Sequence, residues 1–567
     1  MAMSALAVVH IACCVQLWVL AEEKAPQESS GDEGRGTMSV VSVGSGQLSA
    51  EEVAGLAKSA GLALSPEHVE DYRTLLGGLG SVVDSIIAQA DYQPTVDYDK
   101  YPRKDIHIPQ DTDKGGWATK VTAYCTAPKS DLLKGKTVAL KDNMGFAGVR
   151  CTNGTKAVDW TPEIDATVAT RIMDAGGTIT GKATEACENS CMEAVSDTSI
   201  TGPVHNPYAD GYSSGGSSSG SGRLVATGSV DMAIGGDQGG SIRIPASCCG
   251  IVGLKPTWGL VPYTGILSLE ATIDHTGPMT RSVRDNALLL EAIAGPDGID
   301  DRQPAFMDPG SVKYVSKLDG FLEKDGPELL EGMRIGVVEE GFWGSNTDVD
   351  DAVRKATEKF SQLGASVEKV SVPTHKLAGD LLMCGPLLAG AKPCLLSNAP
   401  GRKQLFLTDR MTVSAEKLSQ KAFDSLSAGG QNLYMRHLLA EQKYGPFLHG
   451  KCSNLIRKCS DEYDKALAEF DVLVMPTLPT PPSKMLTAES TAGPLERLAR
   501  TAGFISNTSP FNATGHPALT IPVAFTPAVE DRSVMLPVGL QIVGKKHSEL
   551  DCFKVGGAWE KSFNWKE

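Results

Sequence analysis

A glycine- and serine-rich segment, residues 211–259, constrains this chain more than any other feature of its sequence. It contains the stretch GGSSSGSG around Ser217 and the stretch GGDQGGSIR around Ser241. Because glycine has no Cβ, backbone N–H groups in such loops can come close to a bound group. The segment therefore predicts a site built from serine hydroxyls and accessible backbone N–H groups.

Each half of this segment also has a simpler interpretation. Residues 215–222 alone fit a flexible glycine–serine linker. Residues 236–241 alone fit a phosphate-binding loop, but the G-x-x-x-x-G-K-[ST] pattern is missing there. Two G-x-S-x-G matches, at 211–215 and 216–220, do not follow a predicted strand as a nucleophile elbow requires. Ser414–Lys417 fits S-x-x-K, but the sequence has no K-T-G or S-D-N partner for it.

Strands and helices alternate from Lys136 onward. The patterns predict strands at 137–140, 178–180, 334–338, 367–372 and 471–476, and helices at 166–175 and 349–363. This is the pattern of a parallel or mixed sheet covered by helices. Residues 377–468 are mainly helical and are predicted to form a lobe on this α/β core. Lys141 comes at the end of the first strand, where we expect its side chain to be buried.

Three motifs together resemble the amidase signature family. They are VALKDN at 138–143, GGSSSGSG at 215–222 and GGDQGGSIRIPASCCGIVGLKPT at 235–257. The similarity extends from about residue 136 through 545, and the chain looks most like stand-alone bacterial amidases with an extra N-terminal helical region. The resemblance implies an α/β fold with a mixed β-sheet core sandwiched by helices, an N-terminal helical region and a helical lobe.

The resemblance also implies a catalytic triad. In that family the serine of GGSIR is the nucleophile, the first serine of GGSS follows a cis peptide bond and shuttles protons, and the lysine is the base. These roles fall on Ser241, Ser217 and Lys141. The chemistry is coherent, because a serine hydroxyl needs a neighbouring base to take its proton. Lysine can be that base only when it is uncharged, and burial disfavours its charged form.

Further residues of the site follow from the same resemblance. The backbone N–H groups of Gln238, Gly239 and Gly240, with that of Ser241, are expected to bind the oxyanion of the tetrahedral intermediate. Cys191 is expected to lie along the substrate cleft and to offer its backbone rather than its thiol.

The first 95 residues are predicted to precede the main domain, residues 96–567. Residues 1–21 resemble a signal peptide or a membrane anchor, but their start lacks Lys and Arg. A cytoplasmic, a secreted and a membrane-associated location therefore all stay open. Residues 22–47 are polar and fit a flexible linker. Within 48–95, a capping box at Ser49 and an N-cap at Ser65 followed by Pro66 predict a helical hairpin that packs on the main domain.

Composition argues against several other functions. Acidic residues exceed basic residues by 68 to 53, and no long basic run is present, so nucleic acid is not expected as a partner. Thirteen cysteines, an odd number, indicate buried thiols rather than paired disulfides. Cys187 and Cys191 have no accompanying metal-ligand motif, so no metal or other cofactor is expected. The sequon residues Asn153, Asn507 and Asn512 are glycosylation candidates only if the chain is exported.

The sequence therefore predicts an amidase that converts a small carboxamide to a carboxylate and ammonia or an amine. Two other functions stay open, namely the amidotransferase component of a multi-subunit complex and a non-catalytic binding module. The intact Lys141, Ser217 and Ser241 argue against the binding module. Aliphatic, aromatic, fatty acid and peptide amides and carbamates are all substrates within the family, so the substrate stays undefined. Members of the family often dimerise, which makes a homodimer an expectation.

Overall fold

The central strands of this protein are buried on both of their faces. In β3 (Thr137–Lys141), Val138 and Leu140 belong to one hydrophobic core, while Ala139 between them belongs to another. A strand buried on both faces is typical of a sheet that lies between two layers of helices. The computed structural model describes residues 48–156, 158–185, 194–303, 312–396, 401–411, 417–487 and 490–567, and within them it has one twelve-stranded sheet.

The sheet is mixed. Its strand order is β1-β2-β4-β3-β5-β7-β6-β11-β12-β10-β8-β9. β4, β3 and β5 are parallel to one another, as are β10, β8 and β9, and the other neighbours are antiparallel. The other strands are β1 (Arg103–His107), β2 (Trp117–Ala123), β4 (Thr178–Ala183), β5 (Met232–Asp237), β6 (Val252–Lys255), β7 (His275–Thr280), β8 (Arg334–Val338), β9 (Ser366–Val370), β10 (Val472–Pro476), β11 (Ala518–Pro527) and β12 (Met535–Gly544).

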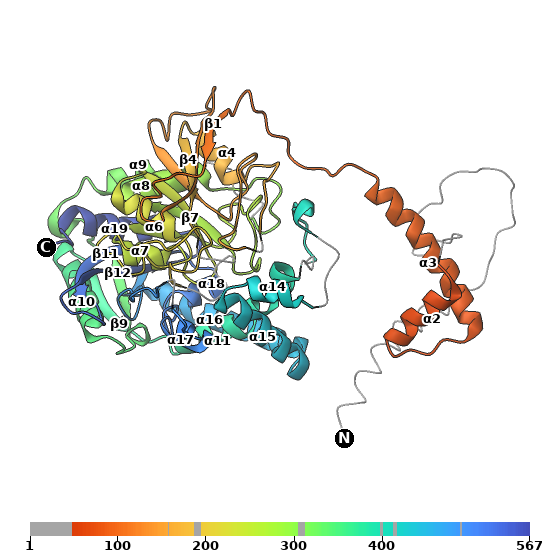
Figure 1. Ribbon diagram of the computed structural model, residues 1–567. Coiled ribbons are helices and arrows are strands. Elements are labelled where there is room, and N and C mark those ends of the chain that lie inside the picture. Colours follow the sequence, from red (N-terminus) through yellow and green to blue (C-terminus); the bar gives the residue numbers. More distant parts are fainter. Residues whose placement is uncertain are drawn as a thin grey trace, which may run out of the picture. The chain divides into compact units, whose positions relative to one another are not determined.

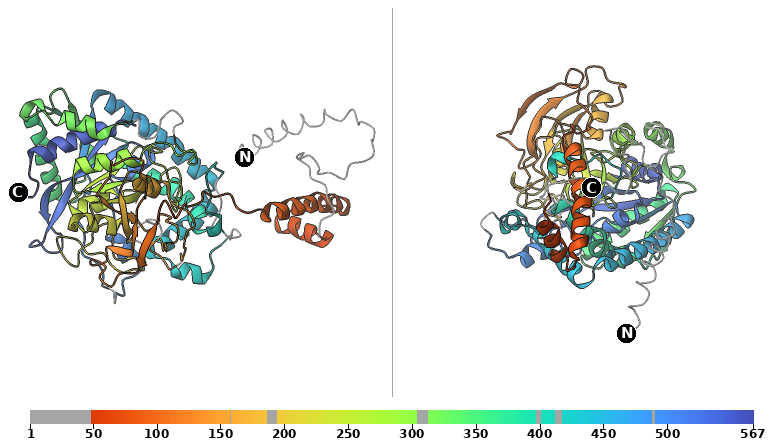
Figure 2. Two further views of the ribbon diagram at one scale, coloured as in Figure 1. Left: turned by 90° about the horizontal axis from the view of Figure 1, so that it is seen from above. Right: turned by 90° about the vertical axis from the view of Figure 1, so that its right-hand side faces the viewer.

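Helices cover both faces of this sheet (Figures 1 and 2). One face packs against α4 (Thr167–Asp174), α8 (Val283–Ile293), α10 (Thr347–Lys359) and α19 (Glu549–Ser562). The other face packs against α6 (Ser219–Thr227), α7 (Arg243–Cys249), α16 (Pro446–Glu469) and α18 (Ser509–Thr514). The structure therefore confirms the predicted α/β fold with a mixed sheet sandwiched by helices.

The region that the sequence predicts to be a helical lobe contains a succession of helices. They are α11 (His375–Cys384), α12 (Pro386–Ala389), α13 (Ala391–Leu395), α14 (Gln420–Ser425), α15 (Ala428–Lys443) and α16. The other helices among the described residues of the main unit are α9 (Tyr314–Phe321) and α17 (Pro494–Ala499), with short 3-10 turns at Gly326–Glu328, Glu339–Gly341, Phe360–Leu363 and Thr408–Arg410. The predicted strands and helices lie within one or two residues of those observed, with two exceptions: β4 continues to Ala183, and α10 ends at Lys359, where the 3-10 turn Phe360–Leu363 continues it.

The chain divides into two compact units, Met1–Tyr92 and Gln93–Glu567. In the described part of the first unit, α2 (Ala50–Ser59) and α3 (Pro66–Ile87) lie side by side as a hairpin (Figures 1 and 2). The Ser49 hydroxyl and the Glu52 carboxylate form the predicted capping box, and Ser65 caps α3 ahead of Pro66. The predicted packing of this hairpin on the main domain stays a prediction.

Most of the described cysteines and all three sequon asparagines are buried. All nine cysteines among the described residues are free thiols, and seven of them are buried, as the sequence predicts. Asn507 and Asn512 are fully buried, and each amide side chain hydrogen-bonds to neighbouring protein groups, while Asn153 is also buried. A glycan has no room at these three positions in the folded chain. None of the described helices is long and apolar enough to cross a membrane.

Candidate active site

The carboxyl ends of three parallel strands meet at one edge of the sheet. Lys141 is the last residue of β3 and is paired in register with Ala183, the last residue of β4. β5, on the other side of β3, ends at Asp237 and leads directly into the loop that carries Ser241. Loops at this edge of an open α/β sheet commonly form ligand sites. Residues far apart in the sequence are therefore brought together here.

Lys141 and Ser217 are in direct contact. Lys141 Nζ and Ser217 Oγ lie 2.5 Å apart, and both side chains are fully buried. Ser217 directly precedes the first turn of α6, and the Gly216–Ser217 peptide bond is cis. At Gly216 a Cβ would lie 2.3 Å from the backbone oxygen of Val195, so the close approach of these two segments of the chain requires glycine. The same loop thus turns the Ser217 hydroxyl toward the lysine.

The loop with Ser241 is held from both sides. The Ser218 backbone N–H donates to the Ser241 carbonyl oxygen at 3.3 Å, which ties this loop to the start of α6. On the other side, Thr508 Oγ1 donates to the Gly239 carbonyl oxygen at 2.6 Å. Gly240 has φ +142° and leaves no room for a Cβ beside Thr508, so this position also requires glycine.

A buried ion pair fixes the two ends of this loop. Arg243 donates to both carboxylate oxygens of Asp237 at 2.9 and 3.0 Å, and neither side chain is exposed. Arg243 also donates to Thr508, Asn512 and Gln541. Burial alone raises the pKa of the Asp237 carboxyl, but the Arg243 charge and the hydrogen bonds to Asp237 outweigh burial and hold that pKa well below its usual range. Asp237 is therefore a permanent anion that anchors the loop.

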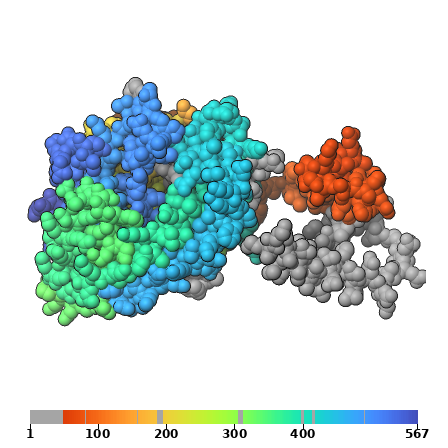
Figure 3. All heavy atoms as spheres, turned by 90° about the horizontal axis from the view of Figure 1, so that it is seen from below, coloured from red at the N-terminus to blue at the C-terminus, as the bar shows by residue number. Residues whose placement is uncertain are grey.

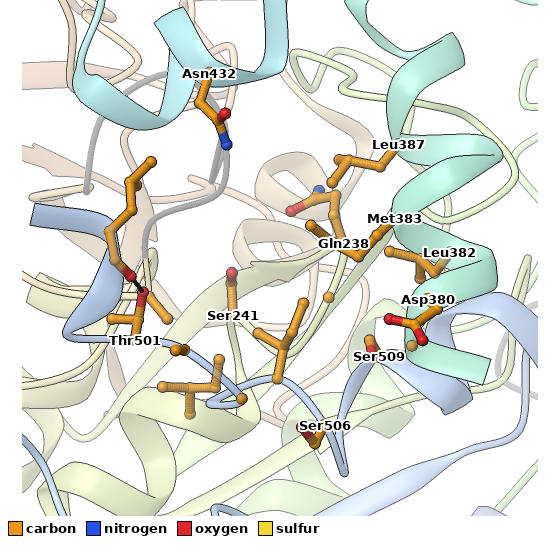
Figure 4. A pocket seen from close by; sticks show the side chains of 18 of the residues that line it. Gln238, Ser241, Asp380, Leu382, Met383, Leu387, Asn432, Thr501, Ser506 and Ser509 are labelled. Carbon is orange, nitrogen blue, oxygen red and sulfur yellow. Dashed lines mark hydrogen bonds between the residues drawn. The ribbon is translucent and has the colours of Figure 1, made fainter. Parts of the chain in front are cut away.

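Ser241 opens into a pocket of about 410 Å³. In Figure 4 its hydroxyl lies near the centre of the lining side chains, with Leu382, Met383 and Leu387 on one side and Thr501 on the other. The lining is mostly apolar, and Lys376 and Asp380 are the charged side chains among the described lining residues. The face in Figure 3 is formed mainly by green to blue atoms of the second half of the chain, to which α11, α12 and the segment 498–509 belong.

The predicted site residues have different positions. Gln238 and Gly239 line the pocket with Ser241, whereas Gly240 is not among the lining residues. The Gln238 amide donates to the Tyr263 hydroxyl at 2.8 Å, so its side chain is held by the protein. Cys191 lies outside the described residues. Within the described ranges, no group of His, Cys, Asp or Glu side chains has the arrangement of a metal site.

Sequence reasoning missed one charged residue of the site. Glu185 Oε1 lies 3.0 Å from Lys141 Nζ, and both side chains are completely buried. Burial raises the pKa of the Glu185 carboxyl to about 7, although the Lys141 charge opposes this rise. The signal was present in the sequence, since Glu185 closely follows a predicted strand that neighbours the strand of Lys141. A longer prediction for that strand would have placed Glu185 near the lysine.

Known amidases resemble this chain over most of its length. The family model described as Amidase matches residues 114–553. The chain belongs to the amidase family. It is 42% identical over 424 residues to an enantioselective amidase from Rhodococcus rhodochrous, an alignment that covers 74% of this chain and 77% of that amidase. The family and the predicted class of enzyme, a hydrolase that acts on amide bonds, are thereby confirmed.

Two further relatives extend the comparison. A glutamyl-tRNA(Gln) amidotransferase subunit from Haloarcula marismortui is 35% identical, over 75% of this chain and 95% of that protein. The structure of the native peptide amidase from Stenotrophomonas maltophilia superposes with a TM-score of 0.60 at 26% identity, and covers 77% of this chain and 84% of that one. The chain thus shares its fold with a peptide amidase and is related in sequence to an amidotransferase subunit.

Proposed function

We propose that this amidase hydrolyses a carboxamide through an acyl-enzyme on Ser241, with Ser217 as proton shuttle and Lys141 as base. The observation that carries the proposal is the buried 2.5 Å contact between Lys141 Nζ and Ser217 Oγ, beside the loop that presents Ser241 to the pocket. A serine nucleophile needs a base for its proton, and a hydroxyl can pass a proton between two groups because it both donates and accepts hydrogen bonds.

In the first half of the reaction, Ser241 Oγ attacks the carbonyl carbon of the amide. Its proton moves to Ser217, and the proton of Ser217 moves to Lys141 Nζ. The C–N bond then breaks, and the same route in reverse delivers a proton to the departing nitrogen. In the second half, water attacks the acyl ester, loses its proton by the same path, and releases the carboxylate and free Ser241.

The tetrahedral intermediate carries a negative oxygen that needs hydrogen-bond donors. We assign this role to the backbone N–H groups of residues 238–241, which directly follow β5 and of which Gln238, Gly239 and Ser241 line the pocket. The bonds from Thr508 to Gly239 and from Ser218 to Ser241 support this assignment, because they fix the orientation of the loop. Preorganised donors of this kind each contribute on the order of 10² to 10³ in rate.

The pocket favours an apolar acyl group. Leu269, Leu382, Leu387, Ile244 and Ile505 all line it. An apolar substrate group gains free energy on leaving water for such a lining, by about 0.8 kcal/mol for each buried CH₂. The substrate class that we propose is therefore a small amide of an apolar carboxylic acid.

The amidotransferase alternative is supported by the Haloarcula marismortui relative. The two functions differ in what the chain can do alone. An amidase hydrolyses its substrate as a purified single chain, whereas an amidotransferase component requires its partner proteins and an acceptor. A non-catalytic binding module would do neither. The expected homodimer bears on none of these alternatives and is checked by the mass of the purified protein in solution.

The test uses the purified full chain with amides that differ in acyl size. We expect release of ammonia or amine without partner proteins, and formation of a hydroxamate when hydroxylamine competes with water for the acyl-enzyme. Hydrolysis without any hydroxamate would favour direct attack by water and would contradict the role of Ser241. Turnover that appears only with amidotransferase partners would favour the alternative function.

A further inference from the structure

Glu185 lies on the same edge and the same face of the sheet as Lys141. Ala183 pairs with Lys141 in the parallel β3–β4 ladder, and Glu185 is two residues beyond Ala183. Side chains alternate between the two faces of an extended chain, so residues 183 and 185 are placed on one face. Ala183 and Ala139, two residues before Lys141, belong to the same hydrophobic cluster. The strand register therefore directs the Glu185 carboxyl toward the lysine.

The contact between Glu185 and Lys141 is close and isolated from water. Glu185 Oε1 and Lys141 Nζ are 3.0 Å apart, and the side chains have no exposed surface. In the described part of the chain, no group other than the Lys141 amine lies in position to donate to either carboxylate oxygen. A buried carboxyl with a single partner depends on that partner for its charge state.

Lys182, a charge that neighbours this pair, has a carboxylate partner of its own. Lys182 Nζ donates to the Asp142 and Met144 carbonyl oxygens at 3.1 and 2.6 Å and lies 3.5 Å from Asp142 Oδ1, so its charge is compensated by Asp142. The groups that act electrostatically on Glu185 come from β3, β4, the loop that follows β3 and the segment between β6 and β7. They are Lys141, Asp142, Lys182, Cys151 and Tyr263.

Lys141 can accept a proton from Ser217 only in its uncharged form. An ionised Glu185 carboxylate at 3.0 Å disfavours this form, because the negative charge stabilises the charged ammonium group. A carboxyl that itself holds a proton removes this opposition. We infer that Glu185 is a positioning residue that shares one proton with Lys141, so that the pair, and not Lys141 alone, is the base of the relay. This inference rests on the proposed function of Ser217 and Ser241.

The proton balance of the step is simple. Before attack the pair holds one proton, and Lys141 Nζ keeps a lone pair directed at Ser217. When the Ser217 O–H bond breaks, an N–H bond forms on Lys141, and the pair holds two protons. When the substrate C–N bond breaks, Lys141 returns one proton through Ser217 to the departing nitrogen. At a pH below the range in which Glu185 loses its proton, the pair already holds two protons and cannot accept another.

The inference is tested by the pH dependence of kcat/KM for wild type and Glu185→Gln. Because the pKa of the Glu185 carboxyl is about 7, wild-type kcat/KM should rise with pH through an acid limb near pH 7. Glu185→Gln cannot titrate, so this limb should disappear or move by more than one pH unit. At about pH 8 kcat should fall about tenfold to hundredfold. KM should stay within about twofold, because Glu185 does not line the pocket.

Two other carboxyls with raised pKa values provide controls, the buried Asp274 and Glu560, which has an exposed surface. Desolvation raises the pKa of Glu560 to about 7 and that of Asp274 to about 6. Glu560→Gln and Asp274→Asn should each leave the limb near pH 7 in place. An unchanged limb and kcat within twofold of wild type in Glu185→Gln would overturn the inference, as would loss of the limb in Glu560→Gln.

Glu185→Asp covers the case in which the Gln variant does not fold. Aspartate keeps a titrating carboxyl but is shorter by one C–C bond, about 1.5 Å, so kcat should fall while an acid limb remains. Wild-type kcat in this variant would overturn the inference. Labelling of Ser241 by a fluorophosphonate separates the two proposals. Labelled Ser241 with an unchanged acid limb in Glu185→Gln contradicts only the role of Glu185, whereas acylation that persists in Ser241→Ala contradicts the proposed function itself.

Discussion

Lys141 Nζ and Ser217 Oγ lie 2.5 Å apart, although 76 positions separate the two residues in the sequence. Lys141 ends a central strand, and Ser217 begins the turn into α6 on the face of the sheet to which Lys141 projects. The contact forms in a fully buried environment, where electrostatic interactions are stronger than in water. The chemistry proposed for this protein depends on that one contact and on the position of Ser241 beside it.

Ser241→Ala should abolish acyl-enzyme formation. The alanine cannot form an ester bond, so the rate of amide hydrolysis should fall at least about 10³-fold, as for other enzymes that lose their nucleophile. Intact-mass measurement after incubation with an activated ester checks this. Ser506→Ala, which removes another hydroxyl from the same pocket, should retain the mass increase. A full mass increase in Ser241→Ala would mean that another residue is the nucleophile.

Ser217→Ala should impair amides more than esters. An amide needs a proton delivered to its nitrogen before the C–N bond breaks, whereas an activated ester leaves without one. The ratio of amide to ester kcat/KM should therefore fall by about tenfold or more. Ser219→Ala is the matched control, because the Ser219 hydroxyl is equally buried but donates to the Gly215 carbonyl oxygen. An unchanged ratio in Ser217→Ala would remove Ser217 from the proton path.

Arg243→Met should destabilise the fold by about 3–5 kcal/mol, because it leaves the Asp237 carboxylate buried without its partner. Denaturant unfolding at neutral pH measures this change. Arg281→Ala, which breaks the largely exposed pair with Asp231, should cost less than about 1 kcal/mol. Equal effects of the two substitutions would show that the buried pair does not anchor the loop of Ser241.

The same ion pair predicts how stability depends on pH. The pKa of Asp237 is held below its unfolded value, so its contribution to stability is present above the unfolded pKa of about 3.9 and is lost as pH falls through the folded one. Unfolding midpoints from about pH 7 down to about pH 3 should therefore decline less steeply for Asp237→Asn than for wild type. Parallel declines would show that other carboxyls dominate the acid response.

Leu387→Ala should shift the preference of the enzyme toward larger acyl groups. Leu387 lines the pocket and is almost fully buried, and its loss opens space for about three carbon atoms. The ratio of kcat/KM for a long acyl amide to that for a short one should rise about tenfold, within the roughly 1–3 kcal/mol that a methylene changes in an apolar pocket. Leu439→Ala on the exposed side of α15 should leave the ratio unchanged. An unchanged ratio in Leu387→Ala would indicate that the acyl group binds elsewhere.

Activity should survive dialysis against a chelator, because the proposed lysine and serines suffice for acyl transfer. The measurement is amide hydrolysis before and after dialysis, with a metal-dependent hydrolase treated in parallel. Inactivation that added zinc or magnesium reverses would contradict the expectation that no cofactor is needed.

Local sequence was enough to predict the α/β fold, whereas the residues of the proposed triad came from the resemblance of three motifs to the amidase family. Strands and helices could be read from apolar periodicity, because each depends on neighbours a few residues away. Lys141, Ser217 and Ser241 stand in motifs whose glycines are required by the backbone itself, as Gly216 and Gly240 show. These constraints act on residues that are consecutive in the chain, so the amino-acid sequence alone reveals them.

The position of Glu185 and the shape of the pocket were decided only by the tertiary structure. Glu185 reaches Lys141 because β3 and β4 pair in one particular register, and the sequence indicates the two strands but not the register that joins them. The pocket wall comes from α11, α12 and residues 498–509, which meet Ser241 only when the helices pack on the sheet. Charge state and substrate preference thus depend on burial and distance, which arise when distant segments pack together and exclude water.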